Sequence, residues 1–269
     1  MPFNYGSENP FNRDLVEVWK TALARGFIHL DTADYYGNER EVGVAIKESG
    51  IPRDKLFVTT KVLHGWKDVP KALNESLARL QLDYVDLYLL HSPYVIPTTE
   101  DIQSAWRGLE VTKASGLARA IGVSNFQRHH LELILKKSTN PPVLNQLEYH
   151  PYLQRSDDYV AWMQDKGIQV SSFRTLAPIT AAPLGPLESV LSSIAAKYTT
   201  TSAAVLLSWA IGNKVVPITT TSKGERMDEY LSAVTLRLSP EEQDEITKLG
   251  LERHFRWWGQ AFFQPDDRS

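Results

Sequence analysis

The chain has 269 residues, a formal net charge of −3 and no cysteine, and 42% of its residues are hydrophobic. That hydrophobic share is enough to bury a core, so it excludes a mainly disordered chain. The absence of cysteine excludes a disulfide framework, a thiolate metal site and a cysteine nucleophile, and the near-neutral charge argues against a protein that binds nucleic acid by neutralising phosphates.

The N-terminal sequence and the hydropathy give no sign of export or membrane insertion. Residues 1–14 have neither a basic start nor an apolar stretch, unlike a signal peptide. No apolar run approaches the roughly 18 residues that a membrane helix needs. We therefore expect a cytoplasmic protein with neither a membrane nor a nucleic acid as partner.

Short strand-like runs alternate along the chain with longer amphipathic stretches. Most of the runs are continuously apolar, which is typical of strands buried on both faces of a parallel sheet. The expected strands are residues 27–31, 55–61, 84–91, 118–124, 142–149, 167–173 and 214–219. Helical periodicity occurs between them, at residues 13–25, 41–49, 69–80, 129–137 and 188–198. This order predicts a parallel α/β fold in a single domain over residues 1–269.

Glycine spacing and strand count favour a closed barrel over an open sheet. The motif G-x-G-x-x-G, which marks an open dinucleotide-binding sheet, does not occur. Seven strand–helix units fit a (β/α)8 TIM barrel with one strand unaccounted for. Residues 1–11 are expected to be irregular, so either residues 2–5 form a poor first strand or the chain lacks it. A missing strand would expose two edges, and we expect a monomer or a weak homodimer.

Reactive side chains fall at the carboxyl ends of the first three expected strands. Asp31 ends the first strand and is followed by Tyr36, Lys61 ends the second, and His91 ends the third. Each alone has a structural explanation, as a helix cap, a loop aromatic, a solvated amine or a turn residue. Because a barrel brings the carboxyl ends of its strands to one mouth, the four together predict a catalytic site.

Five segments of the sequence stand out as motifs: GFIHLDTADYYGNEREVGVAI at 26–46, TTK at 59–61, LLHSP at 89–93, GVSNF at 122–126 and NQLEYHP at 145–151. In content and in order they resemble the aldo-keto reductases, from about residue 12 to the C-terminus. The resemblance implies a (β/α)8 barrel that binds NADPH without a Rossmann fold and reduces a ketone or aldehyde to an alcohol. It also implies that Asp31, Tyr36, Lys61 and His91 are the catalytic tetrad.

The resemblance extends to cofactor-binding positions. Ser124, Asn125 and Gln146 match the residues that hold the nicotinamide carboxamide, and Phe173 stands where the family usually has a tyrosine stacked on the ring. Arg174 replaces a usual small residue, and it either contacts the diphosphate or is exposed to solvent. The remaining expected cofactor residues are Leu176, Thr219, Thr220, Thr221, Ser222, Lys223 and Arg226.

The substrate pocket is expected from aromatic residues, with no metal site. Trp66 and Tyr94 follow the second and third strands, and Trp257 and Trp258 lie in a C-terminal tail, residues 251–269. A packed tail is the alternative for the last two. The C-terminal part resembles fungal members that reduce ketones of keto-amide or polyketide type, which suggests a role in secondary metabolism.

The four tetrad residue types suit proton transfer to a carbonyl oxygen. A phenol has a pKa near 10, so it is a weak acid at neutral pH, and a nearby ammonium lowers that value. Asp31 paired with Lys61 would hold the ammonium, Tyr36 would act as general acid, and His91 would orient the carbonyl.

Two further readings of the function remain open from the sequence. A Schiff-base lyase would use Lys61 as nucleophile, although it leaves the expected nicotinamide residues without a role. A repurposed barrel would bind the cofactor without catalysis.

For the cofactor, the cations Lys223 and Arg226 after the last strand predict NADPH over NADH, and the alternative is a solvated basic loop.

Overall fold

The computed structural model describes residues 10–156 and 158–269, which form two compact units. The first unit ends at Asn145 and the second runs from Gln146 to Ser269. The irregular first strand expected at residues 2–5 lies outside the described residues. Whether the chain is a single domain stays a prediction.

Four parallel strands form the sheet of the first unit. They are β1 (His29–Asp31), β2 (Phe57–Val62), β3 (Val85–Leu90) and β4 (Ala118–Ser124), and each pairs with the next. Every residue of β3 is buried, as its continuous apolar run predicts. In the register, Asp31 is opposite Thr59 and Lys61 is opposite Leu89, so the carboxyl ends of these strands lie at one edge.

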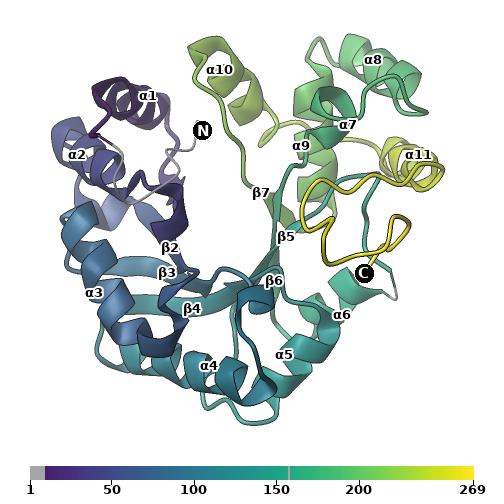
Figure 1. Cartoon of the computed structure of the whole chain (residues 1–269). Coiled ribbons are helices and arrows are strands. Elements are labelled where there is room, and N and C mark those ends of the chain that lie inside the picture. The colour runs from purple at the N-terminus through teal and green to yellow at the C-terminus, as the bar shows by residue number, and fades with distance from the viewer. Residues whose placement is uncertain (1–9, 157) are drawn as a thin grey trace. The chain divides into compact units, whose positions relative to one another are not determined.

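The helices of the first unit follow one another beside this sheet. In chain order, α1 (Arg13–Ala24), α2 (Glu39–Ser49), α3 (Val69–Leu80), α4 (Thr99–Ala114) and α5 (Arg128–Leu135) each pack against the next (Figure 1). Asn12 begins α1 by accepting a hydrogen bond from the Leu15 amide at 3.1 Å. Gly43 allows α2 to approach α3 closely, because a Cβ there would lie 2.2 Å from the Leu80 carbonyl oxygen.

Short 3-10 turns follow the strands and carry predicted site residues. They are η1 (Asp34–Tyr36), η2 (Arg53–Lys55), η3 (Gly65–Asp68) and η4 (Pro93–Val95). Three of them lie just after the carboxyl ends of β1, β2 and β3, and these three carry Tyr36, Trp66 and Tyr94. The fold of the first unit therefore presents these aromatic residues at the edge where Asp31 and Lys61 lie.

The second unit combines two paired strands with six helices. Strand β5 (Leu144–Glu148) crosses the boundary between the units, and β6 (Gln169–Phe173) pairs in parallel with β7 (Val215–Pro217). The helices are α6 (Tyr159–Asp165), α7 (Ala177–Thr180), α8 (Glu188–Lys197), α9 (Ser202–Gly212), α10 (Gly224–Ser232) and α11 (Pro240–Leu251). All seven expected strands are confirmed.

Helix α9 is the buried helix of the second unit. Residues 203–210 are all buried, and α8, α10, α11 and β7 pack around them. A helix that is apolar on every side has no polar stripe. For this reason the amphipathic pattern that predicted the neighbouring α8 gave no signal for α9.

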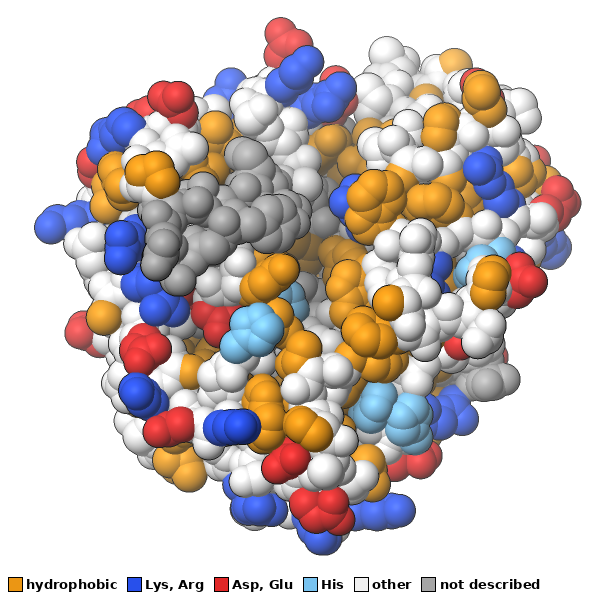
Figure 2. All heavy atoms as spheres, in the orientation of Figure 1, with side chains coloured by type: hydrophobic (Ala, Val, Ile, Leu, Met, Phe, Trp, Pro, Cys, Tyr) orange, Lys and Arg blue, Asp and Glu red, His pale blue; other side chains and the backbone are white. Residues whose placement is uncertain are grey.

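Charged side chains of both signs are mixed on one face of the molecule. Lys and Arg side chains are interspersed with Asp and Glu side chains on the face drawn in Figure 2. Among residues 10–156 and 158–269, no single helix has the length and hydropathy needed to cross a membrane. Helices α8 and α9 meet those criteria only when taken together, with a bend of 94° between them.

Candidate active site

Lys61 is a fully buried lysine at the end of β2, and it contacts the end of β1. Its Nζ donates hydrogen bonds to the Asp31 carboxylate and, at 2.9 Å, to the Thr32 carbonyl oxygen. The Asp31 side chain is 8% exposed. Burial lowers the pKa of Lys61, but the charges and hydrogen bonds of Asp31 and Tyr36 together outweigh it, and the pKa lies above its ordinary value. Lys61 therefore carries an ammonium at neutral pH.

Tyr36 and His91 complete a compact group with Lys61. The Lys61 Nζ lies 4.9 Å from the centroid of the Tyr36 ring, and the Tyr36 hydroxyl lies 3.4 Å from His91 Nε2. The two rings are nearly perpendicular, at 83°. Burial, followed by the charges of Lys61 and His64, holds the pKa of His91 well below 6.5. The four residues predicted to be catalytic thus lie together, with a cationic lysine and a neutral histidine both near a phenol.

Asp34 is a residue of this region that the sequence analysis missed. It lies in η1, two residues before Tyr36, and its carboxylate accepts the Leu63 amide at 3.2 Å. The bond ties η1 to the chain just after Lys61. Burial raises the pKa of Asp34 to about 6, although the Leu63 amide opposes the rise. Its signal in the sequence was the second aspartate of the segment DTAD, which a surface turn would also explain.

Ser124 and Asn125 lie where β4 ends, beside His91. Asn125 has a left-handed backbone, with φ of 63°, and its Nδ2 donates to the His91 carbonyl oxygen at 3.0 Å and to Ser124 Oγ at 3.1 Å. Its Oδ1 is buried and accepts no hydrogen bond from the described part of the chain. An orphaned buried acceptor is costly, and an amide N–H₂ group is the kind of donor that satisfies it.

Gln146, Phe173 and Arg174 belong to the second unit. Gln146 is buried in β5, and Phe173 ends β6, where its carbonyl oxygen accepts the Tyr149 amide at 3.4 Å. Arg174 follows in a left-handed conformation, with φ of 60°. Its guanidinium lies 4.2 Å from the centroid of the Trp257 ring. Trp258 is the next residue of the tail, and Leu176 precedes the short helix α7.

The segment after β7 places two cations at the start of a helix. Thr219, Thr220, Thr221 and Ser222 lead to Lys223, the residue before α10, as expected. The Thr221 hydroxyl accepts the Lys223 amide at 3.1 Å. Lys223 and Arg226 are exposed, and neither forms an ion pair within residues 10–156 and 158–269.

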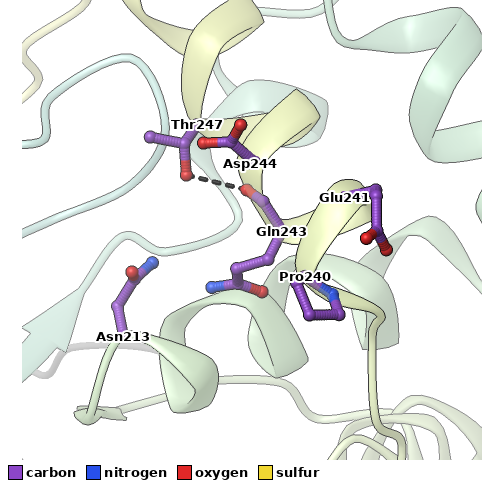
Figure 3. A pocket seen from close by; sticks show the side chains of 6 residues that line it. All are labelled: Asn213, Pro240, Glu241, Gln243, Asp244 and Thr247. Carbon is purple, nitrogen blue, oxygen red and sulfur yellow. Dashed lines mark hydrogen bonds between the residues drawn. The ribbon is translucent and has the colours of Figure 1, made fainter.

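A surface hollow of about 590 Å³ in the second unit lies on other residues. Its lining comes from Asn213 and the first two turns of α11, as Figure 3 shows: Pro240, Glu241, Gln243, Asp244 and Thr247. The Gln243 amide and the Thr247 hydroxyl are already hydrogen-bonded within the protein. None of the six residues was predicted as a site residue.

Trp66 and Tyr94, predicted for the substrate pocket, are partly exposed in η3 and η4. The Tyr94 ring meets the edge of His130, with centroids 5.6 Å apart. His130 Nδ1 accepts the Gln127 amide at 3.2 Å, so this histidine caps α5. Among the described residues, no group of three or more histidine and acidic side chains could hold a metal ion.

The chain belongs to the aldo/keto reductase family, whose model matches residues 3–182. It is 45% identical over 249 residues to an NAD/NADP-dependent indole-3-acetaldehyde reductase of Schizosaccharomyces pombe, covering 91% of this chain and 87% of that protein. Among solved structures, it resembles an aldo/keto reductase from Brucella melitensis, with a TM-score of 0.82 and 33% identity over 93% of this chain and 98% of the other. It also resembles a Bombyx mori aldo-keto reductase in complex with NADP, with a TM-score of 0.80 and 29% identity over 93% of this chain and 92% of the other.

These findings confirm the predicted family, reaction and cofactor. The chain is an oxidoreductase that reduces a carbonyl group with NADPH. Its α/β fold with parallel strands is that of the solved family members. The two other readings, a Schiff-base lyase and a non-catalytic barrel, receive no support.

Proposed function

We propose that Tyr36 is the general acid of this reductase, in a site at the mouth of a closed (β/α)8 barrel. The observation that carries the proposal is the group formed by Lys61, Asp31, Tyr36 and His91, in which an ammonium lies 4.9 Å from the phenol ring and a neutral imidazole lies 3.4 Å from the hydroxyl. The overall likeness to solved family members over 93% of the chain supports the closed barrel.

Each member of the tetrad has a distinct task in this proposal. When bound, NADPH supplies the hydride that adds to the carbonyl carbon. Tyr36 donates its hydroxyl proton to the carbonyl oxygen as negative charge develops there. Lys61 favours loss of that proton electrostatically, and Asp31 holds Lys61 in place. His91 donates a hydrogen bond from Nε2 that orients and polarises the carbonyl.

The nicotinamide site is proposed at Ser124, Asn125, Gln146 and Phe173. The orphaned Oδ1 of Asn125 fits a carboxamide N–H₂ donor, and the buried Gln146 can exchange donor and acceptor with the same group. Phe173 offers an aromatic face for stacking. Leu176, with Arg174 beside it, and residues Thr219 to Ser222 are proposed to line the rest of the cofactor site, with Lys223 and Arg226 at its 2′-phosphate.

For the substrate, we propose a ketone or aldehyde with an aromatic or extended acyl part, as in fungal reductases of keto-amide or polyketide substrates. Trp66, Tyr94, Trp257 and Trp258 would supply the apolar walls. The relative from Schizosaccharomyces pombe is named for an aldehyde attached to an indole ring, which supports an aromatic substrate.

The test is a steady-state assay of NADPH consumption with three carbonyl classes: glyoxal, an arylacetaldehyde and a 2-keto amide. We expect turnover of all three, with kcat/KM highest for the aromatic or keto-amide substrates. A tryptophan-fluorescence titration with NADPH checks cofactor binding separately. Tight NADPH binding without turnover of any carbonyl would overturn the proposal in favour of a non-catalytic binding protein.

A further inference from the structure

The buried carboxylate of Glu148 holds the backbone of the C-terminal tail. Its Oε1 accepts the Trp257 amide at 2.8 Å, and its Oε2 accepts the Trp258 amide at 2.7 Å. His150 Nε2 lies 3.2 Å from Oε1. The side chains of Glu148 and His150 are both completely buried. One carboxylate therefore binds two consecutive amides that are more than 100 residues away in the chain.

The charge of Glu148 is stable in this setting. Burial raises the pKa of its carboxyl group, but the hydrogen bond from His150 and the two tail amides outweigh burial, so the pKa lies below its ordinary value. Burial lowers the pKa of His150, which leaves a neutral ring. Loss of the carboxylate would leave at least one partly buried amide without its acceptor, which costs stability.

The Trp257 side chain contacts Arg174, whereas the Trp257 backbone amide binds Glu148. The guanidinium stacks on the indole at 4.2 Å, and both side chains are exposed. Within the described residues, the guanidinium makes no hydrogen bond and no ion pair, so its N–H groups face solvent. A planar guanidinium held on an aromatic ring keeps its donors available for a carboxylate or phosphate.

Both anchors adjoin residues proposed for the nicotinamide site. Arg174 directly follows Phe173, and Glu148 lies two residues after Gln146 in β5. This step rests on the proposed function, because it takes these two neighbours as the nicotinamide residues. Because Arg174 directly follows the residue proposed to stack on the nicotinamide, we expect its cation to lie near the substrate carbonyl.

We propose that Arg174, stacked on Trp257, is a binding site for an oxyanion, and that Glu148 is the positioning residue that holds Trp257 under it. The ligand chemistry is a carboxylate on the carbonyl substrate or, from the other side of the same site, the diphosphate of the cofactor. Substrates that carry a carboxylate beyond the reacting carbonyl are therefore favoured over neutral ones of the same shape.

The first experiment compares 4-carboxybenzaldehyde with benzaldehyde, which share a carbonyl and differ by one charge. In Arg174→Gln, we expect the ratio of KM for the carboxylated aldehyde to KM for benzaldehyde to rise about 10-fold or more. A loss of NADPH affinity with an unchanged ratio of the two KM values identifies the cofactor diphosphate as the oxyanion. If neither quantity changes, Arg174 binds no oxyanion and the proposal is wrong.

The second experiment tests Glu148 against a matched glutamate of the same unit. Glu242 is 9% exposed and accepts bonds from the Ser239 amide and the Tyr198 hydroxyl, so Glu242→Gln should cost comparable stability. We expect Glu148→Gln, and not Glu242→Gln, to lose discrimination between the two aldehydes and to become sensitive to trypsin at Arg256. Equal behaviour of the two variants would show that Glu148 is merely structural.

A third variant and a binding assay keep the proposal testable if Glu148→Gln does not fold. Trp257→Ala removes an indole that is 50% exposed, so it should fold and lose the same discrimination. Retained discrimination would overturn the role of Trp257. Benzoate, with benzamide as neutral control, should quench tryptophan fluorescence in the wild type and not in Arg174→Gln. The benzoate titration tests the oxyanion site even if the protein reduces neither aldehyde. Lack of turnover would contradict only the proposed function.

Discussion

The Tyr36 hydroxyl oxygen lies 3.4 Å from Nε2 of His91, at the long end of hydrogen-bonding distance. The Nδ1 atom of His91 is buried without a partner among the residues described, which suits a neutral ring protonated at Nε2. Two weakly coupled donors therefore lie near one point. A carbonyl oxygen placed between them can accept from both, which is the arrangement that general-acid reduction requires.

Replacing Tyr36 by Phe removes only the hydroxyl group that we propose as the proton donor. We expect carbonyl reduction to fall by at least about 100-fold, within the range of a lost general acid. The affinity for NADPH should stay within a few-fold, because the hydroxyl acts on the carbonyl oxygen. The measurement pairs NADPH consumption with a fluorescence titration, and turnover near the wild-type rate would remove Tyr36 from the mechanism.

Replacing Lys61 by Met removes the buried cation that the Asp31 carboxylate contacts. A broken buried ion pair costs about 3–5 kcal/mol, so the free energy of unfolding and the yield of folded protein should both fall. Activity should also fall in the fraction that folds. The double variant Lys61→Met, Asp31→Asn is the control: it should recover much of the stability and none of the activity. Recovered activity would show that the ammonium is dispensable.

Much of the fold could be predicted because its strands are short apolar runs with clear ends. The end residues Asp31, Lys61 and His91 were predicted as one site from that position alone, and they do lie together. They lie together because parallel strands bring their carboxyl ends to the same edge, whatever the details of packing, and their catalytic role stays a prediction. The start of α10 at Gly224 was likewise confirmed, although the helix extends to Ser232.

What the sequence could not provide are contacts between residues far apart in the chain. Nothing in the segment NQLEYHP indicated a role for Glu148, because its partners at Trp257 and Trp258 are more than 100 residues away. The role of Asp34 could not be predicted either, because it depends on a hydrogen bond from the Leu63 amide and on burial of the carboxyl group. The stack of Arg174 on Trp257 depends on a left-handed backbone at an arginine, for which there is no sequence signal.

Asp34 predicts a specific dependence of stability on pH. Its pKa is raised from 3.8 to about 6 in the folded protein, so the unfolded chain loses this proton first. The contribution of Asp34 therefore lowers the free energy of unfolding as the pH rises from about 4 to about 6, and the loss persists above that range.

Asp34→Asn keeps an acceptor for the Leu63 amide and removes the titration. Urea unfolding should show the variant about 1–2 kcal/mol more stable than the wild type near pH 8, allowing for partial exposure, and little changed near pH 4. Equal differences at both pH values would contradict the shifted carboxyl.

His91 and His130 predict that the free energy of unfolding falls, instead of rising, as the pH is lowered into the mildly acidic range. Burial holds the pKa of His91 well below 6.5 and lowers that of His130 to about 4, with the charge of His129 adding to the second effect. The unfolded chain takes up these protons as the pH falls below about 6.5, while the folded chain does not. Their contribution to stability is complete above pH 6.5 and is lost as the pH falls toward 4. His130→Gln should reduce that loss, measured as the difference between urea midpoints near pH 7 and pH 5. An unchanged difference would show that His130 titrates normally in the folded chain.

We expect cofactor choice to depend on the exposed cations after β7. Lys223 and Arg226 lie about one turn apart at the start of α10, where the helix dipole also favours an anion. A charged phosphate contact is worth roughly 1.5–3 kcal/mol, or about 10–150-fold in affinity. We therefore expect the wild type to bind NADPH more tightly than NADH by a factor in that range.

Arg226→Ala should remove most of the preference and leave NADH binding nearly unchanged, because NADH has no 2′-phosphate. Arg226→Lys is the matched control, since it keeps the charge, and it should retain part of the preference. Fluorescence titrations of the three proteins with both cofactors provide the measurement, and equal affinity of the wild type for NADPH and NADH would show that these cations do not read the phosphate.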